Sequence, residues 1–322
     1  MNVIQQLKAA VFNGYPVTKE EALSLYNAPL EALGTAANEL REYFLGNTFD
    51  ICTIINGKSG RCSENCKYCA QSALYPTEIQ EYSLLDSERI LKEAIYNKNN
   101  GILRYSIVTS GRNLSDTEMA MICERYRTLR DNCNLSLCAS HGLLSFEQFQ
   151  QLKAAGVTRY HNNLETSRRY FPHICTTHTY NDKIKTIKNA LEAGLEVCSG
   201  GIMGLGETAE DRIDMALDLR SLGIKSVPVN ILNPIKGTPL ENSPKLTAEE
   251  VRRIVAVYRF ILPDAFIRLA GGRSLLPDKG KSIFQSGANA AISGDMLTTY
   301  GIRIRDDMAM LKNLQFEVKL HE

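Results

Sequence analysis

Short apolar runs rich in β-branched and aromatic residues recur along most of the chain, separated by longer segments with helical periodicity. Runs of this kind, bounded by turn residues, are typical of buried strands. We expect strands at Asp50–Asn56, Ile102–Thr109, Asn134–Ala139, Thr158–Leu164, Glu196–Met203, Ser226–Leu232, Phe266–Ala270 and Ala288–Ser293.

The segments between these strands carry the start and stop signals of helices. Ser115 and Thr247 are suited to capping a first helical turn. Gly156, Gly194 and Gly223 come where a helix commonly ends in a left-handed residue. The expected helices are Ser87–Tyr96, Asp116–Asn132, Phe146–Ala155, Asp182–Ala193, Glu210–Leu222 and Ala248–Ile261.

Alternation of strand and helix with short links predicts a parallel sheet. Eight such units in 322 residues favour an α/β fold of the TIM type, a (β/α)8 barrel over residues 46–322 that ends in a short C-terminal tail. Residues 1–45 are predicted to form an N-terminal helical extension. The alternative is an open, doubly wound sheet, which the strand count makes less attractive.

Charge and composition narrow the class of protein. The 37 Lys and Arg residues nearly balance the 36 Asp and Glu residues, so neither nucleic acid nor an anionic membrane surface is an expected partner. No apolar stretch is long enough to span a bilayer, and the first residues show no clear cleavable signal pattern. The nine cysteines favour metal binding or redox chemistry over a disulfide framework. We therefore expect a cytoplasmic enzyme.

Cys62, Cys66 and Cys69 lie in one short run with the spacing Cys-x3-Cys-x2-Cys. Three thiolates can hold three corners of a four-iron cluster (4Fe–4S) and leave the last iron free for a small molecule. A structural zinc site is the alternative, but such a site is usually closed by four ligands, and no second clip completes this one. The run follows the first expected strand, at the end of the barrel where active sites are built.

This spacing, with Tyr68 before the last cysteine, resembles the signature of the radical S-adenosylmethionine (SAM) superfamily. The segment from Cys198 to Glu207 is rich in glycines, which allow close backbone approach to a ligand. By itself the segment is equally typical of an ordinary glycine-rich turn. Beside the triad it resembles the superfamily's SAM-binding stretch, with Gly204 as a cofactor-binding residue.

Cys52, Cys138 and Cys198 fall on the first, third and fifth expected strands. Any one of them alone is typical of a small buried core residue. Alternate strands of a barrel contribute side chains to the same interior layer, so these thiols can converge on a second cluster. Cys175 follows the fourth strand and is a further candidate ligand. Arg268 is another, with a salt bridge in the barrel core as its alternative role.

Asn163 and Asn230 end the fourth and sixth expected strands. Their amides both donate and accept hydrogen bonds, which suits a ureido ring or a ribose, although a loop-capping role is common for either residue alone. The five histidines form no apparent histidine–acid–nucleophile constellation, and this weakens a hydrolase interpretation.

From about residue 45 to 312 the chain resembles the biotin synthase family. The triad alone indicates only the radical SAM superfamily, whereas the further stretches in this order are specific to the family. The stretches are Cys62–Ser72, Tyr160–Ser167, Cys175–Tyr180, Cys198–Thr208, Val227–Asn230, Lys236–Leu240, Ile267–Arg273, Ser286–Asn289 and Leu297–Thr299.

The resemblance implies insertion of sulfur between two unactivated carbons of dethiobiotin. Such C–H bonds have no usable acidity, so a SAM-derived radical opens them and an auxiliary iron–sulfur cluster donates the sulfur. Asn163 and Asn230 match residues that contact dethiobiotin. Glu165 stands where an aspartate holds the SAM ribose, and Lys183 replaces an arginine near the SAM carboxylate. A reductant such as flavodoxin or ferredoxin and a homodimer are expected by the same resemblance.

The chain departs from the better-known form of the family, which binds a two-iron auxiliary cluster (2Fe–2S) through three cysteines and an arginine. Cys138, Cys198 and Arg268 match that set. The remaining cysteine position is Ser106 here, and Cys52 stands where that form has serine. A family variant associated with anaerobes has a four-iron auxiliary cluster with an extra sulfide. We expect this variant, with the 2Fe–2S cluster as the alternative.

Two other functions fit part of the pattern. A related radical SAM enzyme, such as a hydrogenase maturase or a methylornithine synthase, would use the same barrel for another substrate. Asn163, Asn230 and the segment Lys236–Leu240 argue against it. A non-catalytic iron–sulfur carrier would bind iron without cleaving SAM, and the glycine-rich segment argues against that function.

Overall fold

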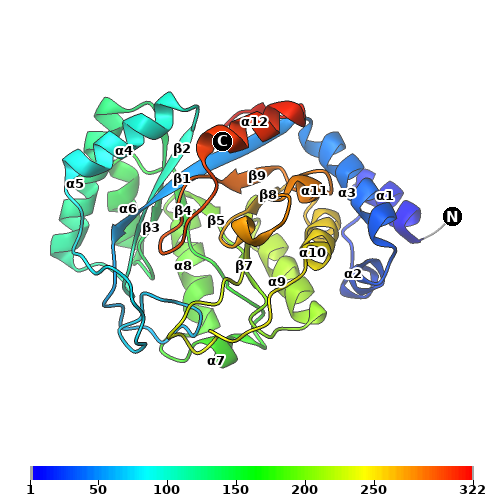
Figure 1. Cartoon of the computed structure of the whole chain (residues 1–322), viewed down its shortest axis with the longest axis horizontal. Helices are drawn as coiled ribbons and strands as arrows, with labels where there is room; N and C mark the ends of the chain where they lie inside the picture. The colour runs from blue at the N-terminus through cyan, green and yellow to red at the C-terminus, as the bar shows by residue number, and fades with distance from the viewer. Residues whose placement is uncertain (1–2, 321–322) are drawn as a thin grey trace.

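The computed structural model describes residues 3–320, and these contain the predicted (β/α)8 barrel (Figure 1). All neighbouring strands are parallel, and pairing of β1 with β9 closes the ring, which excludes the open sheet. The strands are β1 Thr48–Lys58, β2 Arg104–Thr109, β3 Ser136–Ser140, β4 Arg159–His161, β5 Glu196–Cys198, β6 Gly201–Met203, β7 Ser226–Ile231, β8 Phe266–Leu269, β9 Ala290–Ile292 and, outside the ring, β10 Glu317–Val318.

The fifth expected strand is two short strands, so the prediction of one continuous strand was wrong. β5 pairs with β4 and β7, and β6 pairs with β7. Between them, Gly200 has no room for a side chain, because a Cβ there would lie 1.9 Å from the backbone oxygen of Pro228. This glycine therefore permits the close approach of two strands.

All six predicted helices are present, with boundaries shifted by a few residues at most. Ser115 and Thr247 cap α5 and α10 as expected, and Gly156, Gly194 and Gly223 have positive φ. The helices are α1 Val3–Phe12, α2 Lys19–Tyr26, α3 Leu30–Leu45, α4 Ser87–Asn99, α5 Asp116–Asn132, α6 Phe146–Ala154, α7 Phe171–Ile174, α8 Tyr180–Glu192, α9 Ala209–Ser221, α10 Ala248–Ile261, α11 Lys281–Phe284 and α12 Ile304–Asn313, with a short 3₁₀ helix at Arg273–Leu275.

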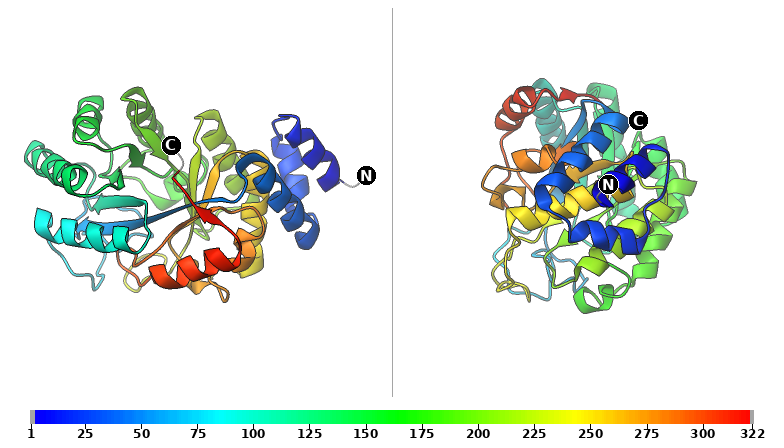
Figure 2. Two further views of the ribbon diagram at one scale, coloured as in Figure 1. Left: turned by 90° about the horizontal axis from the view of Figure 1, so that it is seen from above. Right: turned by 90° about the vertical axis from the view of Figure 1, so that its right-hand side faces the viewer.

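The helices surround the barrel, and α1–α3 lie at one side of it, next to α10 (Figure 2). Arg253 of α10 donates hydrogen bonds to the carbonyl groups of Tyr26 and Ala28, which holds the end of α2 against the barrel. At the other end of the chain, β10 pairs with the start of β1 through Thr48 and Glu317. The division into an extension over residues 1–45 and a barrel over residues 46–322 remains a prediction.

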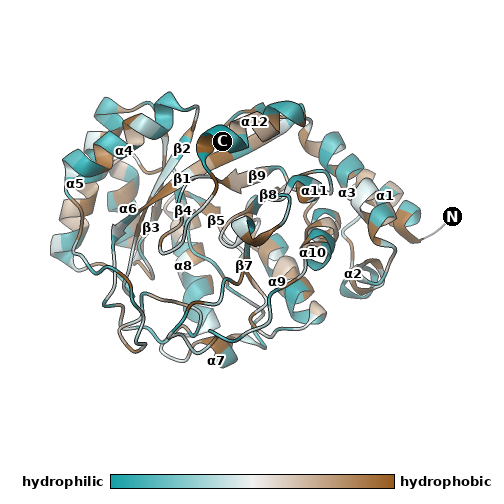
Figure 3. Ribbon diagram, viewed as in Figure 1, coloured by the Kyte–Doolittle hydropathy of each residue, from teal (hydrophilic) through white to brown (hydrophobic). Residues whose placement is uncertain are grey.

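Hydropathy follows the layers of the fold. The helices that cover the barrel alternate hydrophilic and hydrophobic residues around their circumference (Figure 3), as amphipathic surface helices do. Their apolar sides pack on the strands in one continuous core. Among residues 3–320, no helix combines the length and apolar character needed to cross a membrane.

Candidate active site

A cavity of about 410 Å³ occupies the barrel interior and reaches the loops that follow the strands. Alternate residues of each strand face this cavity, so positions two apart lie one above the other along the barrel. Asp50 and Cys52 of β1 illustrate the order, because Asp50 lies deeper and Cys52 nearer the carboxyl end. The cavity wall therefore divides into a charged base, a layer of thiols, a pair of asparagines and a mouth.

Three arginines surround Asp50 at the base. Arg159 Nη1 and Arg268 Nη2 each lie 3.2 Å from an oxygen of Asp50, and Arg104 Nε lies 3.8 Å away. Burial opposes ionisation of this carboxyl, but the three guanidinium groups lower its pKa to about 2. Arg159 also pairs with Glu196 at 2.6 Å. The buried cations still outnumber the buried acid, which suits an anionic group in the layer above.

The structure brings the three predicted thiols Cys52, Cys138 and Cys198 to this one cavity. Arg268 Nη1 donates a hydrogen bond to Cys52 Sγ at 3.2 Å, and Ser226 Oγ donates to Cys198 Sγ at 3.2 Å. All three cysteines are buried. Soft thiol ligands beside buried cations are a chemically suitable set for an iron–sulfur cluster, which is rich in anionic sulfur.

Ser106, the residue at the missing cysteine position, faces the same layer. It is the register partner of Cys138 on β3 and of Ile54 on β1. Cys52 is two residues before Ile54, so it faces the cavity from the neighbouring strand. Moving a thiol from position 106 to position 52 therefore keeps three thiols in one lumen and shifts their centre toward β1.

The three thiols differ in acidity. Burial opposes ionisation of Cys198, but a hydrogen bond to His161 and the charges of Arg268 and Arg159 lower its pKa to about 6. Burial raises the pKa of Cys52 to about 12, although Arg268 offsets part of that effect. Cys198 is thus better prepared than Cys52 to bind a metal as thiolate at neutral pH.

His161 was missed by sequence reasoning. It lines the cavity and is the register partner of Cys198. It lies two residues before Asn163, so the period of two along a strand could have identified it. Arg104 and Arg159 could have been found in the same way, since each precedes an inward-facing residue by two positions.

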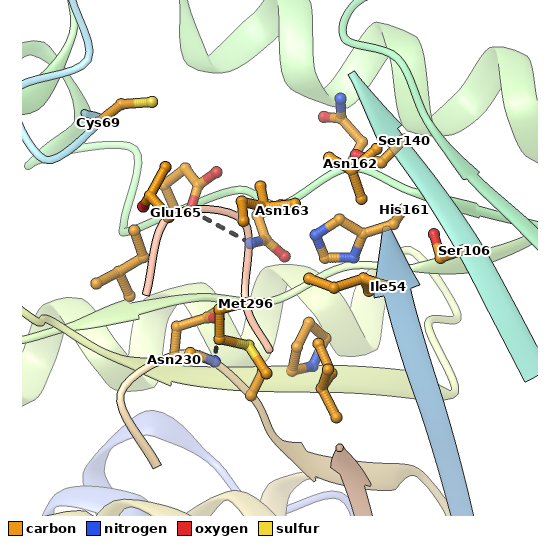
Figure 4. A pocket seen from close by; sticks show the side chains of 18 of the residues that line it. Ile54, Cys69, Ser106, Ser140, His161, Asn162, Asn163, Glu165, Asn230 and Met296 are labelled. Carbon is orange, nitrogen blue, oxygen red and sulfur yellow. Dashed lines mark hydrogen bonds between the residues drawn. The ribbon is translucent and has the colours of Figure 1, made fainter. Parts of the chain in front are cut away.

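Asn163 and Asn230 face the same cavity, each nearer the carboxyl end of the barrel than the thiol layer (Figure 4 shows the two asparagines). Asn163 accepts a hydrogen bond from the Gly200 amide at 3.1 Å, and its Nδ2 donates to Glu165 at 3.4 Å. Asn230 donates to the carbonyl of Gly201 and accepts from the amide of Gly271. An amide side chain can make further bonds, so these contacts fix the two side chains and leave capacity for a polar ligand.

The triad loop forms one side of the cavity mouth. Cys62, Tyr68 and Cys69 line the cavity, and the Lys67 amide anchors the loop by donating to the carbonyl of Ile174 at 2.9 Å. Burial and the nearby carboxylate of Glu165 raise the pKa of Tyr68 well above its usual range. The loop thus presents thiols and a neutral phenol toward the predicted SAM-binding region.

Cys175, a candidate auxiliary ligand, lies beside the triad instead. Its Sγ is 3.7 Å from Sγ of Cys66 and 3.3 Å from Nδ1 of His178. The reason is that the segment carrying it packs against the triad loop, where Asn65 accepts a hydrogen bond from the Thr176 amide at 2.9 Å. Cys175 thus lies apart from the auxiliary thiols, whereas Arg268 lines their cavity and contacts Cys52.

Of the other residues predicted to bind SAM, two line the cavity and one shapes a loop. Lys183 of α8 and Glu165 line the cavity. Glu165 has a φ of 71°, unusual for a residue with a side chain, and its backbone is held by bonds to Gly200 and Ile202. Gly204 donates its amide to Glu207 at 2.8 Å, which shapes the glycine-rich loop. Its contact with SAM remains a proposal.

Comparison with known proteins settles the family. Residues 58–219 match the family model described as the Radical SAM superfamily, and residues 228–317 match the Biotin and Thiamin Synthesis associated domain. A biotin synthase of Akkermansia muciniphila is 61% identical over 99% of this chain and 100% of that protein. The chain belongs to the biotin synthase family. A second biotin synthase, from Clostridium botulinum strain Loch Maree, is 60% identical with the same coverage.

Two solved structures of other proteins share the fold. A methylornithine synthase superimposes with a TM-score of 0.86 at 20% identity, covering 98% of this chain and 97% of that one. A hydrogenase maturase of Carboxydothermus hydrogenoformans gives 0.82 at 16% identity, covering 97% and 78%. At these identities the likeness concerns the barrel alone, so the biotin synthase family rests on the sequence relatives.

Membership of the biotin synthase family implies a 4Fe–4S cluster and SAM. The donor set fits both groups. Cys62, Cys66 and Cys69 offer three thiol ligands for the cluster, which would leave one iron free for SAM. Lys183 and Glu165 line the cavity, where a positive charge and a carboxylate acceptor would suit the carboxylate and the ribose hydroxyl groups of SAM.

Proposed function

We propose that this chain converts dethiobiotin to biotin, with an auxiliary iron–sulfur cluster as the sulfur donor. One observation carries the proposal: a single cavity is lined by the triad cysteines Cys62 and Cys69 at its mouth, and by Cys52, Cys138 and Cys198 toward its base. When bound, SAM and its cluster supply a carbon-centred radical, and the auxiliary cluster supplies sulfur. A substrate between the two groups can be reached by both.

The chain's own residues bind and orient the substrate. Asn163 and Asn230 lie between the two thiol groups and can each offer a further hydrogen bond to the ureido ring of dethiobiotin. Ile202 and Met296 contribute apolar side chains to the cavity wall. An apolar wall helps to exclude water, which protects a radical intermediate from side reactions. Met296 belongs to the segment after β9, which reaches over the cavity.

The auxiliary cluster is proposed to hold four irons, bound by Cys52, Cys138 and Cys198. The exchange of thiol and hydroxyl between positions 52 and 106 supports this, because serine is a poor ligand for iron beside available thiolates. Arg268 contacts Cys52 and is a candidate further ligand or charge partner.

A flavodoxin- or ferredoxin-like reductant and a homodimer are proposed from the family resemblance.

An anaerobic assay with dithionite, SAM and dethiobiotin tests the function. The intact protein should form both 5′-deoxyadenosine and biotin. Changing Cys62, Cys66 or Cys69 to alanine should abolish both products, because each thiolate carries one iron of the cluster that holds SAM. Formation of 5′-deoxyadenosine without biotin in a fully reconstituted enzyme would indicate a related radical SAM enzyme with another substrate. Absence of both products would indicate an iron–sulfur carrier.

A further inference from the structure

Cys66, Cys175 and His178 form a compact group beside the triad loop, and their ligand atoms all lie within 4.8 Å of one another. The proposed function, on which this inference rests, uses only Cys66. We propose that these three side chains bind one thiophilic divalent cation, such as Zn²⁺, when the radical cluster is not bound. Because Cys66 serves both sites, the cation and the cluster exclude each other.

The separation of the two sulfurs matches a tetrahedral site, and His178 lies close to both. Zinc bonds of about 2.3 Å to sulfur and about 2.0 Å to nitrogen, at the tetrahedral angle, place two sulfurs about 3.8 Å apart and a sulfur and a nitrogen about 3.6 Å apart. The Sγ atoms of Cys66 and Cys175 are 3.7 Å apart. Cys175 Sγ lies 3.3 Å from Nδ1 and 3.8 Å from Nε2 of His178. Rotation of the Cys175 and His178 side chains, without a change of backbone, would bring Nε2 and the two sulfurs around one ion.

A buried carboxylate supports the histidine. Glu64 Oε2 lies 2.5 Å from Nδ1 of His178, so Nδ1 can donate to Glu64 while Nε2 binds the cation. A carboxylate that orients a metal-binding histidine in this way is common around zinc. Glu64 also accepts a hydrogen bond from Thr177 Oγ1 at 2.8 Å and lies 3.4 Å from Arg112, which fix its position.

Access and charge agree with a site for a cation. Cys175 and His178 are buried, while Cys66 is partly exposed and gives an ion a path from solvent. Two thiolates and Glu64 outweigh the positive charge of Arg112, so a divalent ion is close to being neutralised. Three protein ligands leave one position for water, as in open zinc sites. Bound there, zinc would block assembly of the radical cluster and leave the auxiliary thiols free.

Cobalt binding to the full-length, iron-free chain tests the proposal. The background protein carries Cys52→Ala, Cys138→Ala and Cys198→Ala, so that the auxiliary thiols contribute nothing. Anaerobic Co²⁺ titration should give the visible bands of tetrahedral cobalt and a sulfur-to-cobalt charge-transfer band, and Zn²⁺ should displace the Co²⁺. Adding Cys175→Ala or His178→Ala should remove these bands. Adding Cys62→Ala with Cys69→Ala, which removes the rest of the triad, should leave them.

Two further results keep the test independent of folding and of the proposed function. Glu64→Gln should weaken Co²⁺ binding about 10- to 100-fold while the bands keep their shape. In the otherwise unaltered chain, prior Zn²⁺ should slow loading of the radical cluster, and Cys175→Ala should abolish this delay, with iron content as the readout. Cobalt bands that survive Cys175→Ala but vanish in the Cys62→Ala, Cys69→Ala variant would overturn the proposal. Neither result depends on dethiobiotin, so failure here is distinguishable from failure of the biotin synthase assay.

Discussion

Arg268 donates a hydrogen bond from Nη1 to Sγ of Cys52 across 3.2 Å, while its Nη2 lies 3.2 Å from Asp50. One guanidinium thus joins the acid at the base of the barrel to the layer of thiols above it. This contact gives the thiol at position 52 a charged partner within the cavity. It supports a ligand role for Cys52 because a thiolate there would face a fixed positive charge.

The ion pairs between Asp50 and the three arginines at the base of the barrel should contribute strongly to stability. Asp50→Asn leaves three buried guanidinium groups without their central carboxylate, so the free energy of unfolding should fall by about 3–5 kcal/mol. Urea unfolding of the iron-free protein measures this. Asp214→Asn is the control, because Asp214 pairs with Lys19 at the partly exposed surface, and its loss should change stability by about 1 kcal/mol or less. Equal effects of the two substitutions would contradict the buried-network account.

Asn230→Ala should weaken dethiobiotin binding selectively. Loss of one partner leaves a ureido group unpaired in a dry site, at about 1–3 kcal/mol, or roughly 5- to 150-fold in Kd. Calorimetry with dethiobiotin and, separately, with SAM checks the selectivity. Asn132→Ala, on the exposed end of α5, is the control and should change neither affinity. A parallel loss of both ligands in Asn230→Ala would point to a folding defect.

Asp211 should make stability depend on pH in the acid range. Burial opposes its ionisation, but hydrogen bonds from Ser167, Arg169 and Thr208 lower its pKa to about 2. Because the pKa of Asp211 is lower in the folded state than in the unfolded state, its carboxylate stabilises the fold at pH values above about 4, the pKa in the unfolded chain. This contribution is lost as the pH falls from about 4 to about 2. Asp211→Asn should lower stability at neutral pH and show a shallower decline over that window. Acid titrations of both proteins in urea give the comparison, and identical slopes would count against the assignment.

The alternation of residues along strands made much of the site predictable. Cys52, Cys138 and Cys198 were expected to meet in the lumen of the barrel, and all three line one cavity, at positions that the period of two of a strand turns inward. The same rule also reaches His161 and Arg104. They were missed because sequence reasoning started from residue types with known chemistry and did not follow each strand to its inward-facing positions.

Loops resist such reasoning because their position is set by tertiary packing. Cys175 was expected near the auxiliary thiols, yet contacts of its segment with Asn65 carry it to the triad. The close approach of Gly200 to Pro228 likewise depends on tertiary structure, namely the pairing of β6 with β7. Neither contact has a signal in the local sequence.

Iron and sulfide counts with Mössbauer spectra on anaerobically purified protein test the central claim, that the auxiliary cluster holds four irons with Cys52 as a ligand. Two four-iron clusters predict about eight irons per chain. Cys52→Ser should retain SAM cleavage, lose biotin formation and keep about four irons. The control is Cys123→Ser, which changes a buried cysteine of α5 that is not among the residues lining the cavity. This variant should keep the full iron content. About six irons in the unaltered protein, or normal biotin formation by Cys52→Ser, would contradict the account.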